Sequence, residues 1–462
     1  MNSIKSINID FSRVEGVYFA GIGGIGMSAL ARFCKLMGKQ VEGYDLNKTH
    51  LTEQLESEGI RVIYHDDPEL ISKAMIDGKT LVVRTPAVSD DLKILTFWRS
   101  RDVDIVRRSQ MLGYIASQYR LVAVSGTHGK TTVTAMTSHI LNQRPQGVNA
   151  FIGGITANYQ SNLLLSENSD VLVAEADEFD RAFLYFNPNY AVITSIDPDH
   201  LDIYQNYENI VNAFQQFSRQ LLPGGTLIIN QKLLSVLPLN SGYYTYHVNN
   251  PEADYFAKDI ENHNGYYRFT LVTPDGERKN LRTGVPGFHN LENSIAASAL
   301  ALNVGIDKDA LQRGLETFSG VKRRFEVLHH GKEVYIDDYA HHPKEIEACI
   351  NSARQLFKSQ KITVIFQPHL YSRTRDLMDQ FAQALSLADE VILLPIYPAR
   401  ELPITGVDSS QLVKKIPKSK YLSYSEVLSY VRNHQFEMLI TMGAGDIGEL
   451  ASSIKDILNN RL

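Results

Sequence analysis

Short apolar runs alternate with longer stretches of helical periodicity in three successive parts of the chain. This alternation is typical of parallel β-strands joined by covering helices. In the first part, an apolar run at 17–20 precedes a glycine cluster, a helical stretch at 27–38 and a second strand that reaches Asp45. A further apolar strand at 81–88 belongs to the same part. The pattern predicts a first α/β unit.

The second part begins near Leu121 and changes character along its length. It carries three apolar strands, at 171–178, 190–197 and 225–230. Later segments are rich in β-forming residues around a Pro-Asp-Gly turn at 274–276, which predicts an antiparallel hairpin insert. An alanine-rich helix at about 289–303 closes this unit.

The third part runs from near Val321 to the end and repeats the first pattern. Its predicted strands lie at 333–338, 362–366, 390–396 and 437–441. A chain of 462 residues is too long for one ordinary core and fits two to four domains of roughly 150 residues. We therefore predict three α/β domains.

Composition narrows the function classes. A hydrophobic content of 44% with 21% charged residues is that of a soluble protein. The net charge of −6 offers neither a basic surface for nucleic acid nor a membrane tether. The apolar runs are too short to span a membrane, and the N-terminal stretch does not have the apolar run expected of a signal peptide. Cys34 and Cys349 are the only cysteines, which excludes a disulfide framework. We expect a cytoplasmic monomer or weak homodimer.

Polar and glycine-rich clusters follow the apolar strands repeatedly. They read GIGGIG, SGTHGKTT, EADEFD, DPDH, DDYAHHP, QPHLYSRT and MGAGD. Ligands of open parallel sheets bind outside the carboxyl ends of the strands. So many clusters predict one composite cleft between the domains.

The stretch 124–132, VSGTHGKTT, has the character of a phosphate-binding loop. A strand leads into it and a helix is expected to begin at Lys130, so backbone N–H groups and the helix N-terminus would face a phosphate. Lys130, which we expect to be an exposed charge, would reach the β- and γ-phosphates, and Thr131 would hold Mg²⁺. The alternative is an ordinary glycine turn. The predicted nucleotide contacts are Gly126, Thr127, His128, Gly129, Lys130, Thr131 and Thr132.

A metal-holding acid is expected near this loop. Glu175 ends an apolar run and is followed by Asp177, Glu178 and Asp180. A carboxylate at a strand end suits a hard cation, and at least two of the four acids are expected to be solvated. His200 is either a nitrogen ligand of a second cation or a cap of the next helix.

The first glycine cluster fits the dinucleotide fingerprint through Gly21, Gly23 and Gly26. Asp45 follows about 20 residues later, where a ribose-binding acid would stand. Taken alone, this favours a nicotinamide dehydrogenase. Any nucleotide with a diphosphate can use the same turn, and a turn without a ligand is a further alternative.

The third part gathers acids, histidines and arginines. In the segment 337–343, DDYAHHP, contact with a substrate or ribose is favoured over a metal site, since adjacent residues rarely ligate one ion. His369 and Arg373 could bind a carboxylate, for which arginine offers a bidentate fork. Arg323 and Arg324 are placed for a hinge or for phosphate charge.

Together these clusters, in this order, resemble the Mur ligase family. The matching stretches are GIGGIGMSALA, SGTHGKTT, AEADEFD, DHLD, GFHNLENSIAA, KRRFE, DDYAHHP, FQPHLYSRT, IYPARE and MGAGD, from Gly21 to Asp446. Members couple ATP hydrolysis to amide formation with three domains, for a UDP-sugar, ATP and an amino acid. The short loop is similar to the family's own version, G-T-x-G-K-[ST].

The resemblance implies an α/β fold with three domains, each built on a mainly parallel sheet with covering helices. The N-terminal domain would be Rossmann-like, the central one P-loop ATPase-like with an antiparallel insert, and the C-terminal one Rossmann-like. The expected boundaries are 1–119 for the UDP-sugar domain, 120–319 for the ATP domain and 320–462 for the amino-acid domain.

The resemblance also implies site roles. Lys130, Glu175, His200 and Arg324 would be catalytic, and Thr131, Glu175 and His200 would bind Mg²⁺. His289, Asn290 and Asn293 would lie at the adenosine side, with Arg324 and Asp338 reaching ATP. The substrate contacts would be Gly21, Gly23, Gly24, Gly26, Asp45, Thr85, Arg107, Tyr339, His341, His369 and Arg373, of which His369 and Arg373 form the amino-acid pocket.

Two features refine the resemblance. Sister ligases use a carbamylated lysine in the central domain, but no lysine occurs between Lys130 and Lys232, which agrees with the alanine-adding branch. The substrates implied are UDP-N-acetylmuramate and L-alanine, joined through an acyl phosphate. The common late motif QPHRYSRT has Leu370 in place of its arginine here, so Arg373 or another residue must bind the carboxylate.

Three alternatives stay open. One is a recycling ligase that adds a tripeptide to the same sugar nucleotide, against which the FQPH stretch speaks. Another is a nucleotide-binding switch without catalysis, because a phosphate loop alone indicates only binding. The last is the NAD-dependent dehydrogenase.

Overall fold

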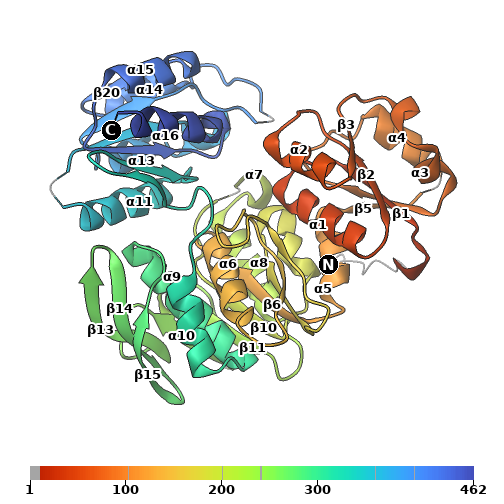
Figure 1. Ribbon diagram of the computed structural model, residues 1–462, viewed down its shortest axis with the longest axis horizontal. Coiled ribbons are helices and arrows are strands. Elements are labelled where there is room, and N and C mark those ends of the chain that lie inside the picture. Colours follow the sequence, from red (N-terminus) through yellow and green to blue (C-terminus); the bar gives the residue numbers. More distant parts are fainter. Residues whose placement is uncertain are drawn as a thin grey trace. The chain divides into compact units, whose positions relative to one another are not determined.

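The computed structural model describes residues 11–101, 103–199, 201–239, 242–358, 360–399 and 401–461 (Figure 1). The chain forms two compact units. The first comprises Met1–Lys258, Thr270–Leu281 and Asn293–Phe318, and the second comprises Asp259–Phe269, Arg282–Glu292 and Ser319–Leu462. None of the helices in the described ranges could cross a membrane.

The N-terminal sheet has five parallel strands in the order β3-β2-β1-β4-β5. Its strands are β1 (Gly16–Ala20), β2 (Gln40–Tyr44), β3 (Arg61–Ile63), β4 (Thr80–Arg84) and β5 (Ile105–Arg107). Its helices are α1 (Ile25–Leu36), α2 (His50–Ser57), α3 (Lys73–Asp77), α4 (Lys93–Arg99) and α5 (Arg108–Ala116). Every residue of β1 is buried, as expected for a central parallel strand covered on both faces.

The central sheet has ten strands in the order β15-β14-β13-β12-β11-β10-β6-β9-β7-β8. The strands are β6 (Arg120–Ser125), β7 (Asn149–Phe151), β8 (Leu163–Leu164), β9 (Val171–Glu175), β10 (Tyr190–Ile193), β11 (Thr226–Asn230), β12 (Tyr243–His247), β13 (Tyr255–His263), β14 (Tyr266–Thr273) and β15 (Gly276–Arg282). The helices are α6 (Lys130–Leu141), α7 (Leu201–Tyr204), α8 (Tyr207–Ser218), α9 (Phe288–Val304) and α10 (Lys308–Thr317). Strand β6 pairs in parallel with β9 and β10, which places their carboxyl ends at one edge.

The hairpin insert predicted around the Pro-Asp-Gly turn is confirmed. Strands β14 and β15 are neighbours in the sheet and only Pro274 and Asp275 separate them. So short a connection joins antiparallel strands only. The turn is fixed by the Thr273 hydroxyl, which donates to the Gly276 carbonyl at 2.7 Å.

The first two sheets share one hydrophobic core within the first unit. Phe33 of α1 packs on Phe151 of β7 with ring centroids 5.6 Å apart. The fully buried Asn162 amide donates to the Ile25 carbonyl at 2.5 Å and accepts from the Arg32 guanidinium at 2.9 Å. Helix α1, which follows the first glycine cluster, is therefore anchored on the central sheet.

The C-terminal sheet has six strands in the order β16-β17-β21-β18-β19-β20, parallel except for the edge strand β16. Its strands are β16 (Glu326–His330), β17 (Val334–Asp338), β18 (Ile362–Phe366), β19 (Glu390–Leu393), β20 (Ser419–Tyr421) and β21 (Met438–Met442). Its helices are α11 (Pro343–Leu356), α12 (Tyr371–Asp376), α13 (Met378–Leu385), α14 (Ser409–Lys415), α15 (Val427–Asn433) and α16 (Ala451–Asn459).

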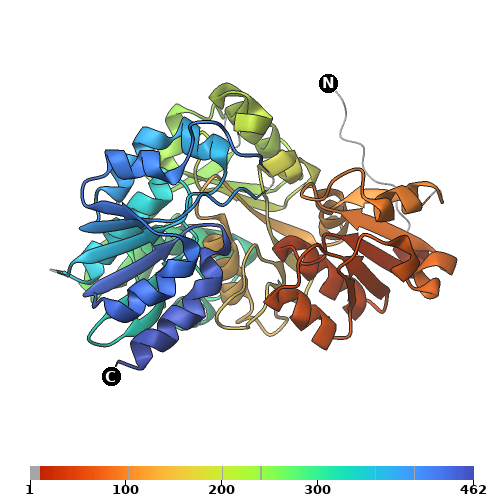
Figure 2. The same ribbon diagram turned by 90° about the horizontal axis from the view of Figure 1, so that it is seen from above.

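Side chains of this sheet alternate between two cores, one on each face. Ile336 of β17 joins a cluster with Val364 and Ile440, whereas the preceding Tyr335 joins a cluster with Ile365. This is the period-2 alternation of a strand. Figure 2 shows the helices of this domain on both faces of its sheet. The predicted fold class, three α/β domains on mainly parallel sheets with an antiparallel insert, is confirmed.

Candidate active site

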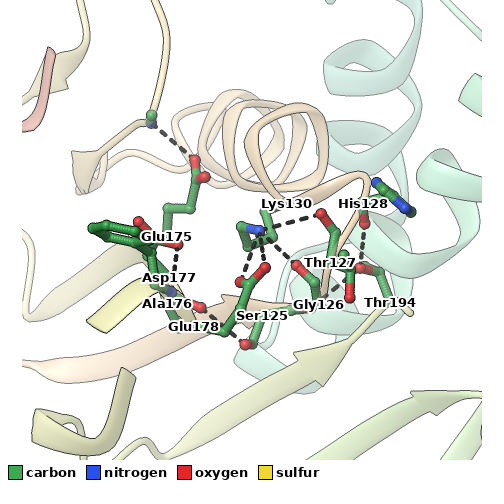
Figure 3. A network of polar contacts seen from close by, with 12 residues as sticks. Ser125, Gly126, Thr127, His128, Lys130, Glu175, Ala176, Asp177, Glu178 and Thr194 are labelled. Carbon is green, nitrogen blue, oxygen red and sulfur yellow. Dashed lines mark hydrogen bonds and ion pairs between the residues drawn. The ribbon is translucent and has the colours of Figure 1, made fainter. Parts of the chain in front are cut away.

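The stretch 124–132 forms the predicted strand–loop–helix phosphate loop (Figure 3). Strand β6 ends at Ser125 and helix α6 begins at Lys130, with Gly129 as its N-cap at φ 83°. Gly126 has a φ of 133°, and a Cβ there would lie 2.1 Å from the Thr194 hydroxyl oxygen. Only glycine fits this position. The backbone therefore has the open turn and helix N-terminus that suit a phosphate.

Residues after strand β10 hold the loop in shape. The Thr127 N–H donates to the Ser195 carbonyl at 3.0 Å, and the His128 N–H donates to the Ser195 hydroxyl at 2.8 Å. The Thr194 hydroxyl in turn donates to the His128 carbonyl at 2.5 Å. Asp197 lies with its carboxylate 3.4 Å from His128 Nε2. The loop is thus preorganised by its own protein contacts.

Lys130 is not the exposed charge that the sequence led us to expect. Its side chain is only 13% exposed, and Nζ donates to the Gly126 carbonyl at 2.7 Å and to the Thr127 carbonyl at 3.3 Å. Nζ also contacts both carboxylate oxygens of Glu178, at 3.0 and 2.8 Å. Burial alone would lower the pKa of Lys130, but the attraction of Glu178, Asp177 and Glu175 outweighs it and raises that pKa.

Glu175 stands at the end of β9 and faces the start of α6. Its carboxylate accepts from the Thr131 hydroxyl at 3.2 Å and from the Gly153 N–H at 3.0 Å. A hydroxyl and a carboxylate oxygen beside a phosphate loop are donors that fit Mg²⁺. His200, the third predicted metal ligand, lies outside the described residues. In the described part of the chain, no three His, Cys, Asp or Glu side chains are grouped to hold a metal.

The remaining acids of this cluster are paired with arginines. Asp177 lies 3.7 Å from Arg108, and Asp180 lies 2.8 Å from Arg107. The predicted substrate residue Arg107, the last residue of β5, thus lies beside the loop that carries these acids. Arg108, the first residue of α5, escaped the sequence analysis because no motif marks it. Only folding brings it to Asp177.

The GIGGIG cluster is a second strand–glycine–helix turn. Gly21 has a φ of 86°, and a Cβ on it would lie 2.5 Å from the side chain of Thr85, another predicted substrate residue. The Gly23 N–H donates to the Asp45 carboxylate at 2.7 Å. Gly24 caps α1, and a Cβ on Gly26 would lie 2.9 Å from the Arg108 guanidinium. The predicted fingerprint residues therefore come together as one turn.

The three residues predicted at the adenosine side diverge. Asn293 approaches the phosphate loop, because a Cβ on Gly129 would lie 3.0 Å from its Oδ1. His289 instead contacts the Ser352 hydroxyl of α11 at 2.8 Å, and burial lowers its pKa to about 4. Asn290 is buried and donates to the Pro286 carbonyl at 2.7 Å.

The two aspartates of DDYAHHP serve different partners in the second unit. Asp337 is fully buried and contacts Arg323 at 2.9 Å. Asp338 accepts from the backbone N–H groups of Phe325 at 2.6 Å and Ala340 at 2.7 Å. Burial raises the pKa of Asp338 to about 6, against the attraction of Arg324 and these two N–H groups. Both aspartates thus brace the segment that carries the two arginines.

An aromatic column links the predicted substrate residues of this unit. The Arg324 guanidinium lies 5.0 Å from the Tyr339 ring centroid, and Tyr339 packs edge-on against His341 at 5.3 Å. His341 in turn meets His369 at 5.9 Å.

Residues that follow strands β18 and β19 complete the column. His369 stacks on Tyr397 at 5.7 Å, and its Nδ1 lies 3.5 Å from Arg373. Tyr397 was not among the predicted residues, although it stands in the IYPARE stretch. Leu370 has a φ of 70°, which is strained for a leucine. The predicted residues Tyr339, His341, His369 and Arg373 do lie together.

Sequence models of one protein family match the chain in three parts. The Mur ligase family catalytic domain matches residues 16–120, the Mur ligase middle domain matches 124–301, and the Mur ligase glutamate ligase domain matches 323–447. The three matches include both glycine turns and the aromatic column.

Full-length relatives agree with these matches. A UDP-N-acetylmuramate–L-alanine ligase of Phocaeicola vulgatus is 44% identical over 458 residues, which cover 98% of this chain and 100% of the relative. The crystal structure of a UDP-N-acetylmuramate–alanine ligase from Thermotoga maritima superposes with a TM-score of 0.81 at 29% identity, covering 97% of this chain and 100% of that one. A murein peptide ligase from Psychrobacter arcticus shares the fold, with a TM-score of 0.71 at 22% identity, over 96% and 99% of the two chains. The chain therefore belongs to the Mur ligase family.

Proposed function

We propose that this protein is an ATP-dependent, ADP-forming ligase that joins L-alanine to the carboxylate of UDP-N-acetylmuramate. The observation that carries the proposal is the preorganised phosphate loop, with Lys130 at its helix start, in a chain that is 44% identical to an alanine ligase over its full length. The reaction belongs to peptidoglycan synthesis and we assign it to the cytoplasm, with the protein as a monomer or weak homodimer.

ATP would bind at the second glycine turn. The N–H groups of 126–132 and the N-terminus of α6 would face the phosphates, and Lys130 would neutralise their charge. Asn293 beside Gly129 supports its predicted place near the nucleotide. We assign His289 and Asn290 to supporting the start of α9. The His289 ring contacts the Ser352 hydroxyl, and the Asn290 amide donates to the Pro286 carbonyl.

Mg²⁺ would be held by Thr131 and Glu175, with His200 as a third ligand. When bound, the ion would offset the charge that develops on the transferred phosphoryl group. Gly153 supports this assignment from the protein side, because its N–H fixes the Glu175 carboxylate at 3.0 Å.

The sugar nucleotide would bind at the first glycine turn. The N-terminus of helix α1 suits its diphosphate. Thr85 lies beside Gly21, and Arg107 is paired with Asp180. Asp45 is assigned to shaping the turn through Gly23, and a ribose contact would use its other oxygen. The domain boundaries 119/120 and 319/320 remain part of this proposal.

The amino acid would bind at the aromatic column. Arg373 beside His369 is the group for the alanine carboxylate, since Leu370 cannot serve. Tyr339 and His341 would line the pocket. Arg324 would reach ATP, and Asp338 would act by holding the backbone next to it.

The proposed reaction has two steps. A carboxylate oxygen of the muramoyl group attacks the γ-phosphorus and ADP leaves, so Lys130 meets the negative charge that builds on the bridging oxygen. The alanine amine then attacks the acyl carbon, loses a proton, and inorganic phosphate leaves. The water-free surroundings that an acyl phosphate needs would come from closure over the substrates.

Release of ADP, measured with each substrate omitted in turn, tests the proposal. We expect turnover only when ATP, Mg²⁺, UDP-N-acetylmuramate and L-alanine are all present. Replacing alanine with the tripeptide of the recycling reaction should give no ADP.

The other outcomes identify the alternatives. Turnover with the tripeptide but not with L-alanine, with the other substrates present, would indicate the recycling ligase. ATP binding without turnover in the complete mixture would indicate a nucleotide switch, and a nicotinamide fluorescence change on titration would indicate a dehydrogenase.

A further inference from the structure

Lys130 is held in a retracted position by a buried counter-ion. Its ammonium group points back to the Gly126 and Thr127 carbonyls and to Glu178, whose side chain is only 3% exposed. A lysine that neutralises β- and γ-phosphates must carry its charge to them. Every contact named here would compete with that role.

The loop that carries Glu178 is firmly built. The hydroxyl of the fully buried Tyr204 donates to the Glu178 carbonyl at 2.7 Å, and the Phe183 N–H donates to the Asp177 carbonyl at 2.8 Å. Asp180 and Arg181 have φ values of 52° and 55°, a conformation that costs energy in residues other than glycine. The Arg107–Asp180 pair holds it from β5. Such over-determination fixes Glu178 against the lysine.

From this geometry we infer that Glu178 is a positioning residue, which we call the counter-ion latch. It keeps Lys130 withdrawn until the phosphates of a nucleoside triphosphate or diphosphate replace Glu178 as the partner of Lys130. The inference rests on the proposed function of the loop and deepens it. Nucleotide binding must break the Lys130–Glu178 ion pair, and the free energy that this costs lowers the observed affinity. Weakening the latch should therefore tighten binding, the opposite of what losing a ligand or a structural acid would do.

The test is nucleotide affinity in the full-length protein, measured with ADP and Mg²⁺ by titration calorimetry. Glu178→Gln keeps the shape of the side chain but removes its charge. We expect it to bind ADP about 3- to 10-fold more tightly than the wild type, in the range of ordinary coupling energies. Unchanged or weaker binding would overturn the inference.

Asp177→Asn is the matched control, because it removes one negative charge from the neighbouring residue, which contacts Arg108 and not Lys130. Its ADP affinity should rise by a clearly smaller factor than that of Glu178→Gln, since Asp177 attracts Lys130 but forms no ion pair with it. Equal tightening in both variants would show a general charge effect and would also overturn the latch.

Steady-state kinetics give a second readout. Glu178→Gln should lower the KM for ATP, whereas a merely structural loss would raise it or leave it unchanged. Glu178→Asp retains the charge but shortens the side chain, so it covers the case in which the glutamine variant does not fold. It should tighten ADP binding by a smaller factor.

The latch and the proposed ligase activity fail in different ways. Absence of ADP release in the complete reaction, with Glu178→Gln still binding ADP more tightly than the wild type, would refute the ligase and leave the latch standing. Failure of the wild type to bind ADP would refute both, because no nucleotide would then open the pair.

Discussion

Two glycine turns in the first unit use the same backbone device with opposite charges beside it. Each follows a buried parallel strand, contains at least one glycine at positive φ and leads into a helix N-terminus. In the first turn the Gly23 N–H is held by the Asp45 carboxylate. In the second the helix begins with Lys130, which Glu178 holds back. The backbone makes both turns suitable for phosphate, and the charged side chains beside them distinguish the two.

The largest effect is expected from removing the cation of the second turn. Lys130→Ala should reduce the rate of ADP release about 10³-fold, because phosphoryl transfer relies on electrostatic stabilisation. It should also lower the free energy of unfolding by about 3 kcal/mol, since Glu178 loses its buried partner. Lys308→Ala is the matched control, as Lys308 is the exposed first residue of α10. A variant that turns over normally would contradict the assignment of the second turn.

The helix of the second turn also carries an acid-sensitive anchor that the first lacks. His139 of α6 is buried between the Tyr159 and Thr317 hydroxyls, and burial lowers its pKa to about 4. Its folded pKa lies below the unfolded value of about 6.5. The unfolded chain therefore binds the proton first, and stability present above pH 6.5 is lost as the pH falls towards 4.

Urea unfolding at pH 7 and pH 4.5 measures this loss. His139 should contribute up to about 3 kcal/mol to it, and His139→Gln should remove that part of the pH dependence. His50→Gln, at an exposed histidine on α2, is the control and should leave the dependence unchanged. The same pH dependence in His139→Gln as in the wild type would show that His139 is not the anchor.

A smaller pair of effects would separate the two turns directly. Gly126→Ala places a Cβ 2.1 Å from the Thr194 hydroxyl, and Gly23→Ala places one 2.7 Å from Thr52 and 2.9 Å from Asp45. The first should weaken ADP binding and the second should weaken UDP-N-acetylmuramate binding, each about tenfold, or about 1.4 kcal/mol. Each should leave the other ligand's affinity within about twofold. Loss of both affinities in either variant would merge the two turns into one site.

Much of the fold was predictable because it rests on local pattern. The continuous apolar runs of β1, β9 and β18 mark strands buried on both faces, and the Pro-Asp-Gly turn marks the insert. The edge strands β16 and β20 were missed. They are half-exposed and mixed in composition, so they lack the apolar signal.

The site was predictable in its residues more than in its contacts. Motif spacing located Lys130, Glu175 and Asp45, since each lies at or shortly after the end of a strand. The Lys130–Glu178 pair spans 48 positions and depends on β6 and β9 being neighbours, which spacing does not reveal. Arg108 was missed for the same reason.

The central claim is that a carboxylate oxygen of the sugar substrate attacks ATP at the Lys130 loop. UDP-N-acetylmuramate labelled with ¹⁸O in its carboxylate tests this most directly, with the released phosphate analysed by mass spectrometry after turnover with L-alanine. The account predicts one ¹⁸O in each phosphate, because the oxygen bonded to phosphorus in the first step leaves with it in the second. Unlabelled phosphate released with amide formation would contradict it.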